Sequence, residues 1–179
     1  MRLTSIIFAL IVPLANSGHG QQLKIQNLKE LVAAGKDLSV QISLADSIYR
    51  ANQFSNLGVA EVFAAEFNRL AELSGKESDK IRALQVRADV FFSQGNFFEA
   101  KHLAQKILDA GVVLHNHEVI TDGYLRLSES YFYTHRLDFA GFFAARAYDQ
   151  ALEYQEQRSV SDALRLMGLV YSELRQDSA

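Results

Sequence analysis

Residues 81–108 hold two helix patterns separated by one short turn, and this stretch constrains the fold more than any other. In its first half, Ala88 and Phe91 belong to a set of apolar residues spaced three or four apart, the period of one helix face. Gly95 and Asn96 then form a turn signal, and asparagine is a residue type that caps helices. The stretch predicts an antiparallel pair of closely packed helices. The second helix has its own apolar face, formed by Ala100, Leu103, Ala104, Ile107 and Leu108.

Copies of this pattern recur along the chain. The first downstream copy begins 40 residues after Ala88 and consists of Ser128, Tyr131, His135, Leu137 and Ala140. A partial copy begins after another 40 residues, at Gly168 and Tyr171. Upstream, with Ala45 in the place of Ala88, it is found at Ala45, Ile48, Asn52, Phe54 and Leu57. A single helix pair cannot bury its apolar face, so neighbouring pairs are expected to stack. No stretch alternates apolar and polar residues for long enough to form a sheet, and the prediction is one all-α domain.

The unit at residues 88–100 resembles the tetratricopeptide repeat. In that family's pattern, a small residue is followed along the chain by an aromatic residue, a glycine, a second aromatic residue and an alanine. The matching residues here are Ala88, Phe91, Gly95, Phe97 and Ala100. The resemblance covers roughly residues 38–175. Its period of about 40 residues is similar to the longer variants of a repeat that usually has about 34. The resemblance implies a right-handed α-solenoid of antiparallel helix pairs.

Helix boundaries follow from the periodic patterns and from cap signals. Ser74 with Glu77 is expected to form a capping box for the helix that follows, and Ser159 with Asp162 a weaker one for the last helix. Gly111 is expected to end the second helix of the central pair. Besides the central pair we expect helices at 21–34 (ended by Gly35), 38–52, 56–73, 115–134, 137–155 and 160–175.

Residues 1–17 have the composition of a secretory signal peptide. Arg2 gives a positive start, an apolar run follows from Ile6 to Leu14, and small residues near Ser17 fit a cleavage site. The apolar run is shorter than the about 20 residues that a membrane-spanning helix needs. We therefore expect no stable membrane span in the mature chain, residues 18–179. The alternative for residues 1–17 is an N-terminal helix that is buried or frayed. Export and the long repeat period are typical of a bacterial periplasmic protein.

Composition and motifs exclude several classes of function. The net charge is −3 and the pI is about 5.9, without the basic stripe that a nucleic-acid-binding protein needs. The chain has no cysteine and therefore no thiol nucleophile or zinc–thiolate site. His115 and His117 offer two metal ligands, but their spacing does not align them on a helix and no third ligand is indicated, so a solvated loop is favoured. No motif indicates catalysis or a cofactor, and we do not expect an enzyme.

The resemblance also indicates where a partner would bind. In this family the first helix of each pair lines a concave groove, and the residue after the core aromatic usually points into it. Those positions are Tyr49, Phe92, Phe132 and Ser172, and Tyr133 adds a further aromatic ring. The alternative for Phe92 and Phe132 is that they pack between neighbouring repeats. Polar contacts on the same face are expected from Arg82, Gln85, Asp89 and Glu129.

These features predict a non-catalytic interaction module or scaffold that binds a protein or peptide partner in its groove. The alternative is a periplasmic sensory or regulatory input domain, because exported repeat regions of this period resemble those that precede diguanylate cyclase or histidine kinase outputs. The sequence leaves the identity of the partner and the oligomeric state open.

Overall fold

The computed structural model describes residues 18–176. These residues form eight α-helices and no strand, so the prediction of an all-α chain is confirmed for this range. Outside the central pair, the predicted helix boundaries agree with the observed ones to within three residues. The expected signal peptide, residues 1–17, lies outside the described range. The helices are α2 (Gly18–Ala33), α3 (Leu38–Asn52), α4 (Leu57–Ser74), α5 (Glu77–Ser93), α6 (Phe97–Val113), α7 (His117–Tyr133), α8 (Leu137–Glu153) and α9 (Gln157–Gln176).

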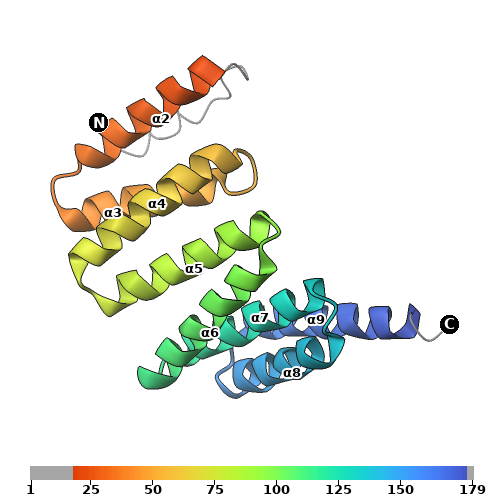
Figure 1. Cartoon of the computed structure of the whole chain (residues 1–179). Coiled ribbons are helices and arrows are strands. Elements are labelled where there is room, and N and C mark those ends of the chain that lie inside the picture. The colour runs from red at the N-terminus through yellow and green to blue at the C-terminus, as the bar shows by residue number, and fades with distance from the viewer. Residues whose placement is uncertain (1–17, 177–179) are drawn as a thin grey trace. The chain divides into compact units, whose positions relative to one another are not determined.

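The chain divides into two compact units, one ending at Gly75 and the other beginning at Lys76. In unit 1, α3 packs against α4, and α2 contacts both (Figure 1). In unit 2, each helix from α5 to α8 packs against the helix that follows it, and α7 also contacts α9. Short turns join these helices, so neighbours in the chain are neighbours in space and run in opposite directions. In unit 2 we call α5, α7 and α9 the first helices and α6 and α8 the second helices.

The turns of unit 2 share one backbone geometry. Gly95, His115, His135 and Gln155 all have positive φ angles, between 50° and 74°, and they recur at a constant interval, one after each helix from α5 to α8. This left-handed region favours glycine, because a Cβ atom crowds the backbone there. His135 therefore occupies the same turn position as Gly95, and the sequence register that aligned these two residues is confirmed.

Asparagine caps three of the helices. The side chain of Asn96 accepts a hydrogen bond from the backbone N–H of Glu99 at 3.3 Å. Asn56 and Asn116 do the same at the starts of α4 and α7. The cap satisfies a backbone N–H that has no partner inside the helix. The turn predicted at Asn96 is thus confirmed with its cap.

Two other cap predictions are wrong. α5 begins at Glu77 with Lys76 in the cap position, and the Lys76 side chain makes no capping hydrogen bond because it has no oxygen to accept one. Ser74 is still the last residue of α4, and its hydroxyl donates to a carbonyl of the same helix at 2.8 Å. α9 begins at Gln157, so Ser159 lies inside the first turn rather than before it.

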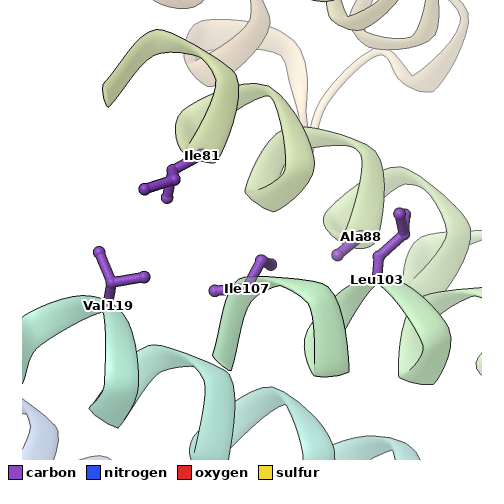
Figure 2. Packing of buried hydrophobic residues seen from close by; sticks show 5 residues of the cluster. All are labelled: Ile81, Ala88, Leu103, Ile107 and Val119. Carbon is purple, nitrogen blue, oxygen red and sulfur yellow. The ribbon is translucent and has the colours of Figure 1, made fainter. Parts of the chain in front are cut away.

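The core of unit 2 begins where α5, α6 and the start of α7 meet (Figure 2). Partly buried Leu84 and Phe91 pack against this core from α5. Ala88 and Ala100 are both buried, at 2% and 3% exposed, as expected for small residues where two helices pack closely. Burying one large aliphatic side chain contributes about 1.5–3 kcal/mol, so this core is a main source of stability for the pair. Its buried members are Ile81, Ala88, Leu103, Ile107 and Val119.

Two glycines let α6 and α7 approach closely. A Cβ atom added at Gly123 would lie 2.8 Å from the Cα atom of Leu108, and one added at Gly111 would lie 2.8 Å from the backbone nitrogen of Ile120. α6 continues through Gly111 to Val113, so the prediction that Gly111 ends this helix is wrong. Position 111 is suited to glycine because α7 leaves no room for a side chain.

Candidate functional site

Two of the predicted groove residues, Gln85 and Asp89, belong to a polar network between α5 and α7. The side-chain amide of Gln85 donates to Asp122 at 3.0 Å, and the guanidinium of Arg126 donates to the same carboxylate at 2.7 Å. Arg126 also donates to Asp89 and forms an ion pair with it. One arginine therefore links carboxylates on two helices and fixes how α5 and α7 are placed along one another.

The surroundings of Arg126 favour its charged form. Burial alone would lower the pKa of this guanidinium, but the carboxylates of Asp122 and Asp89 outweigh burial and raise the pKa above its ordinary value. Only 19% of the Arg126 side chain is exposed, so water screens these interactions less than at the surface. An arginine in this state does not release its proton near neutral pH. The charged guanidinium therefore holds the two helices together through both carboxylates.

A second ion pair connects α7 to α9. Arg165 donates to Glu129, another predicted groove residue, at 2.8 Å. The two side chains are 51% and 31% exposed. Ion pairs this exposed contribute only about 0–1 kcal/mol to stability, so Glu129 and Arg165 exchange partners at little cost.

The aromatic side chains predicted for the groove gather at the end of α7. The ring centroid of Tyr133 lies 5.1 Å from that of Phe92 and 5.5 Å from that of Phe132, both in edge-to-face arrangements. Phe97, the first residue of α6, stacks on Tyr133 at 5.0 Å and meets Phe92 edge to face at 5.2 Å. Ring pairs at such separations add about 0.5–1.5 kcal/mol each beyond the burial of their area. We call these four residues the aromatic cluster.

The polar network and two rings of the aromatic cluster, Phe92 and Tyr133, share one side of the first helices. Residues spaced alternately three and four apart lie on one face of a helix. We call the surface with this spacing the polar–aromatic face. It consists of Gln85, Asp89 and Phe92 on α5, Asp122, Arg126, Glu129 and Tyr133 on α7, and Arg165 on α9.

Two further predicted groove residues, Tyr49 and Arg82, lie on α3 and α5. Tyr49 lies on α3 in unit 1 and has only 2% of its surface exposed. Adjacent residues on a helix point about 100° apart, and the buried part of α3 is wide enough to include both Ile48 and Tyr49. Arg82 is half-buried on α5, about one turn before Gln85.

Sequence reasoning missed four residues of this site: Phe97, Asp122, Arg126 and Arg165. A signal was available for Arg126, because Val86 and Leu166 occupy the equivalent positions of the neighbouring repeats and both are buried. A charged residue at an otherwise apolar position of the repeat indicates that it has a partner inside the protein. For Phe97 the repeat pattern indicates only an aromatic residue after the turn, and nothing in the spacing indicates its stacking on Tyr133.

The two histidines that were considered as metal ligands have separate roles in the fold. His117 stacks on Tyr154 with ring centroids 3.5 Å apart, and its Nδ1 atom lies 3.0 Å from the side-chain amide nitrogen of Gln150. His115 occupies the left-handed turn position before α7. In the described part of the chain, no group of three His, Cys, Asp or Glu side chains is placed to hold a metal ion.

Among residues 18–176, no helix combines the length and the apolar character needed to cross a membrane. No protein-family model matches this chain, and no curated protein is significantly similar to it in sequence. Its function is therefore inferred from the geometry of the polar–aromatic face and from the pattern of the repeats.

Proposed function

We propose that this chain is an exported, tetratricopeptide-like repeat protein that binds a protein or peptide partner on its polar–aromatic face. In this proposal the helix pairs wind into a right-handed α-solenoid, and the first helices line its concave groove. The protein acts in the periplasm after removal of residues 1–17, by binding and not by catalysis. The repeated sequence register and the left-handed turn that recurs between the helices of unit 2 support the repeat assignment.

The aromatic cluster is the observation that carries the proposal. Tyr133 exposes 51% of its surface although its ring contacts Phe92, Phe97 and Phe132. A ring that is exposed but held in place by other rings loses little side-chain entropy when a partner covers it. Such preorganised aromatic residues often provide most of the binding energy of an interface. Tyr133 is therefore the anchor of the proposed binding site.

The polar residues of the face have two roles in this proposal. The carboxylates of Asp89 and Asp122 already bind Arg126, so the network holds α5 and α7 in place and keeps the aromatic cluster assembled. Arg165 and Glu129 form the ion pair that joins α7 to α9, and the Arg165 side chain is 51% exposed, against 19% for Arg126. Their remaining hydrogen-bonding capacity is available to polar groups of a bound segment.

Photo-crosslinking in the native host tests whether a partner covers this face. In one variant of the full chain, a photoreactive phenylalanine analogue replaces Tyr133. In the matched control it replaces Phe142, an aromatic residue of α8 that is 52% exposed and lies outside the polar–aromatic face. We expect a discrete crosslinked partner from position 133 and none from position 142. Products that are the same at both positions, or absent at both, would count against the proposal.

A double substitution, Phe92→Ala with Phe132→Ala, weighs the alternative that these rings only pack between repeats. Truncating a fully buried Phe costs about 3–5 kcal/mol, and these half-buried rings should cost less. We expect a near-native thermal midpoint together with loss of the crosslinked partner. A collapse of stability in the double variant would make the rings structural, and the proposal would be given up.

A further inference from the structure

Three exposed aromatic rings of unit 2 have a cation of the same chain above them. The Nζ atom of Lys101, for example, lies 5.4 Å from the ring centroid of Phe98. The face of an aromatic ring carries partial negative charge and attracts a cation at such a distance. In unit 2, exposed rings are therefore sites where cations bind. The other two pairs are Arg136 over Phe139, at 4.6 Å, and Arg146 over Phe142, at 5.3 Å.

Tyr133 is exposed to a similar degree, but its contacts are with other rings. Among the residues that the structure describes, no lysine or arginine lies over its ring. Phe92, Phe97 and Phe132 hold the ring in place, and about half of the residue is still exposed. The exposed part of Tyr133 is therefore available to a cation that another molecule supplies.

A carboxylate lies beside this ring. Glu129 is one helical turn before Tyr133 on α7, so the two side chains are neighbours on one helix face. The Oε1 atom of Glu129 accepts a hydrogen bond from Arg165 at 2.8 Å, which shows that a guanidinium reaches this carboxylate. A carboxylate has two oxygen atoms and accepts several hydrogen bonds. Because the ion pair is exposed, a second guanidinium can share Glu129 with Arg165 or replace it at little cost.

The cations closest to the end of α7 lie on its other side. Tyr131 and Tyr133 are two residues apart and therefore point to nearly opposite sides of the helix. Lys101 lies over Tyr131, and Arg136 lies over a ring that itself stacks on Tyr131. On α9 the repeat equivalent of Tyr133 is Glu173, which adds a second carboxylate to this end of the polar–aromatic face. The surroundings of Tyr133 are therefore suited to a positively charged group.

We propose that Tyr133 and Glu129 together bind an arginine side chain of the partner segment. This inference rests on the proposed function, because it names what the polar–aromatic face recognises in its partner. The guanidinium lies over the exposed part of the Tyr133 ring and donates hydrogen bonds to the carboxylate of Glu129. Arginine suits this pair better than lysine, because a planar guanidinium stacks on a ring and donates two parallel hydrogen bonds to one carboxylate.

Selection from a library of random dodecapeptides displayed on phage tests the proposal, with the full chain as bait. We expect the selected segments to be enriched in arginine relative to the starting library, and Tyr133→Ala and Glu129→Gln to lose this enrichment. Tyr171→Ala is the matched control. Tyr171 is 71% exposed on α9, but no carboxylate lies three or four residues from it on that helix. This variant should select the same segments as the natural chain.

A selected segment, made synthetically with a fluorescent label, allows the guanidinium to be tested by itself. Citrulline keeps the shape of arginine but carries no charge, and its substitution for the arginine should weaken binding by about 10-fold or more in fluorescence anisotropy. Exchanging the two charges, with Glu129→Arg and Arg165→Glu in one variant, keeps an ion pair between α7 and α9 and places a guanidinium beside Tyr133. That variant should bind the segment about 10-fold more weakly and should prefer one with glutamate in place of the arginine.

Failure of this inference and failure of the proposed function give different results. Segments that need Tyr133 but show no enrichment in arginine would overturn the inference and leave the binding function standing. Equal affinities for the arginine and citrulline segments would do the same. A chain that selects no segment at all would count against binding on this face, and so against both. Glu129→Gln changes only a charge on an exposed side chain, so it decides the matter if circular dichroism shows that Tyr133→Ala has lost helix.

Discussion

The guanidinium of Arg126 on α7 donates a hydrogen bond to the carboxylate of Asp89 on α5, 37 residues earlier in the chain. It also holds Asp122 on its own helix. Arg126→Met keeps much of the side chain's length but removes the cation that both carboxylates share. The carboxylates are 33% and 27% exposed, so water offsets part of the loss. We expect the free energy of unfolding in urea to fall by about 1–3 kcal/mol.

The control for this substitution is Arg50→Met. Arg50 pairs with Asp46 within α3 at 2.7 Å, and its side chain is 60% exposed. Pairs of this kind contribute little, so the free energy of unfolding should change by less than about 1 kcal/mol. Equal costs for the two substitutions would show that the network around Arg126 contributes no more than a surface ion pair.

Gly123→Ala should loosen the contact between α6 and α7. The new Cβ atom would lie 2.8 Å from both the Cα and Cβ atoms of Leu108, and neither atom can move away without moving its helix. We expect a loss of about 1–3 kcal/mol in the free energy of unfolding. Gly141→Ala is the matched control, because its Cβ atom would meet only a methyl group of Val170 at 3.5 Å. That variant should gain up to about 1 kcal/mol from helix propensity, and a loss as large as that of Gly123→Ala would contradict the assignment.

His135→Gly should stabilise the chain. His135 has a φ of 54°, and this left-handed conformation costs a residue with a Cβ atom about 1–2 kcal/mol. The greater freedom of glycine in the unfolded chain offsets about 0.5–1 kcal/mol of that gain. We expect a net gain of up to about 1 kcal/mol, measured as a higher melting temperature by calorimetry. The reverse experiment, Gly95→Ala, should lower the melting temperature, and a lower value for His135→Gly would show that its imidazole makes contacts worth more than the strain.

If the protein is exported, we expect residues 1–17, which lie outside the described range, to be removed. If they are a signal peptide, the protein recovered from its native host should begin near Gly18. Intact-mass spectrometry of the purified protein measures this directly. A soluble cytoplasmic protein that retains Met1 would show that the segment has another role.

The helices and their repeat register could be predicted because the signals for them are local. Apolar spacing marks each helix, and the turn at Gly95 and Asn96 carries its own residue types. The cap at Ser74 was mispredicted because two signals compete there. Gly75 ends α4 in a left-handed conformation, with a φ of 69°, so Ser74 is the last residue of α4 and its hydroxyl donates to the carbonyl of Ala71.

The candidate site could be predicted only in part, because its contacts join residues that are far apart in the chain. The register placed Phe92 and Phe132 at equivalent positions, and the structure brings both to Tyr133. The partners of Asp89 depend on the reach of an arginine side chain across two helices, which spacing along one helix does not reveal. For Tyr49 the sequence could not show how much of α3 is covered.

The left-handed turns at Gly95, His115, His135 and Gln155 also govern how this chain can change in length. A deletion between alternate turns removes one whole helix pair. It joins two turns of the same backbone geometry, and a first helix then takes the place of the first helix that was removed. A deletion that runs only to the next turn would instead set the alanine-rich sequence of a second helix where the charges and aromatic rings of the polar–aromatic face belong. Viable lengths for unit 2 therefore come in steps of a whole helix pair.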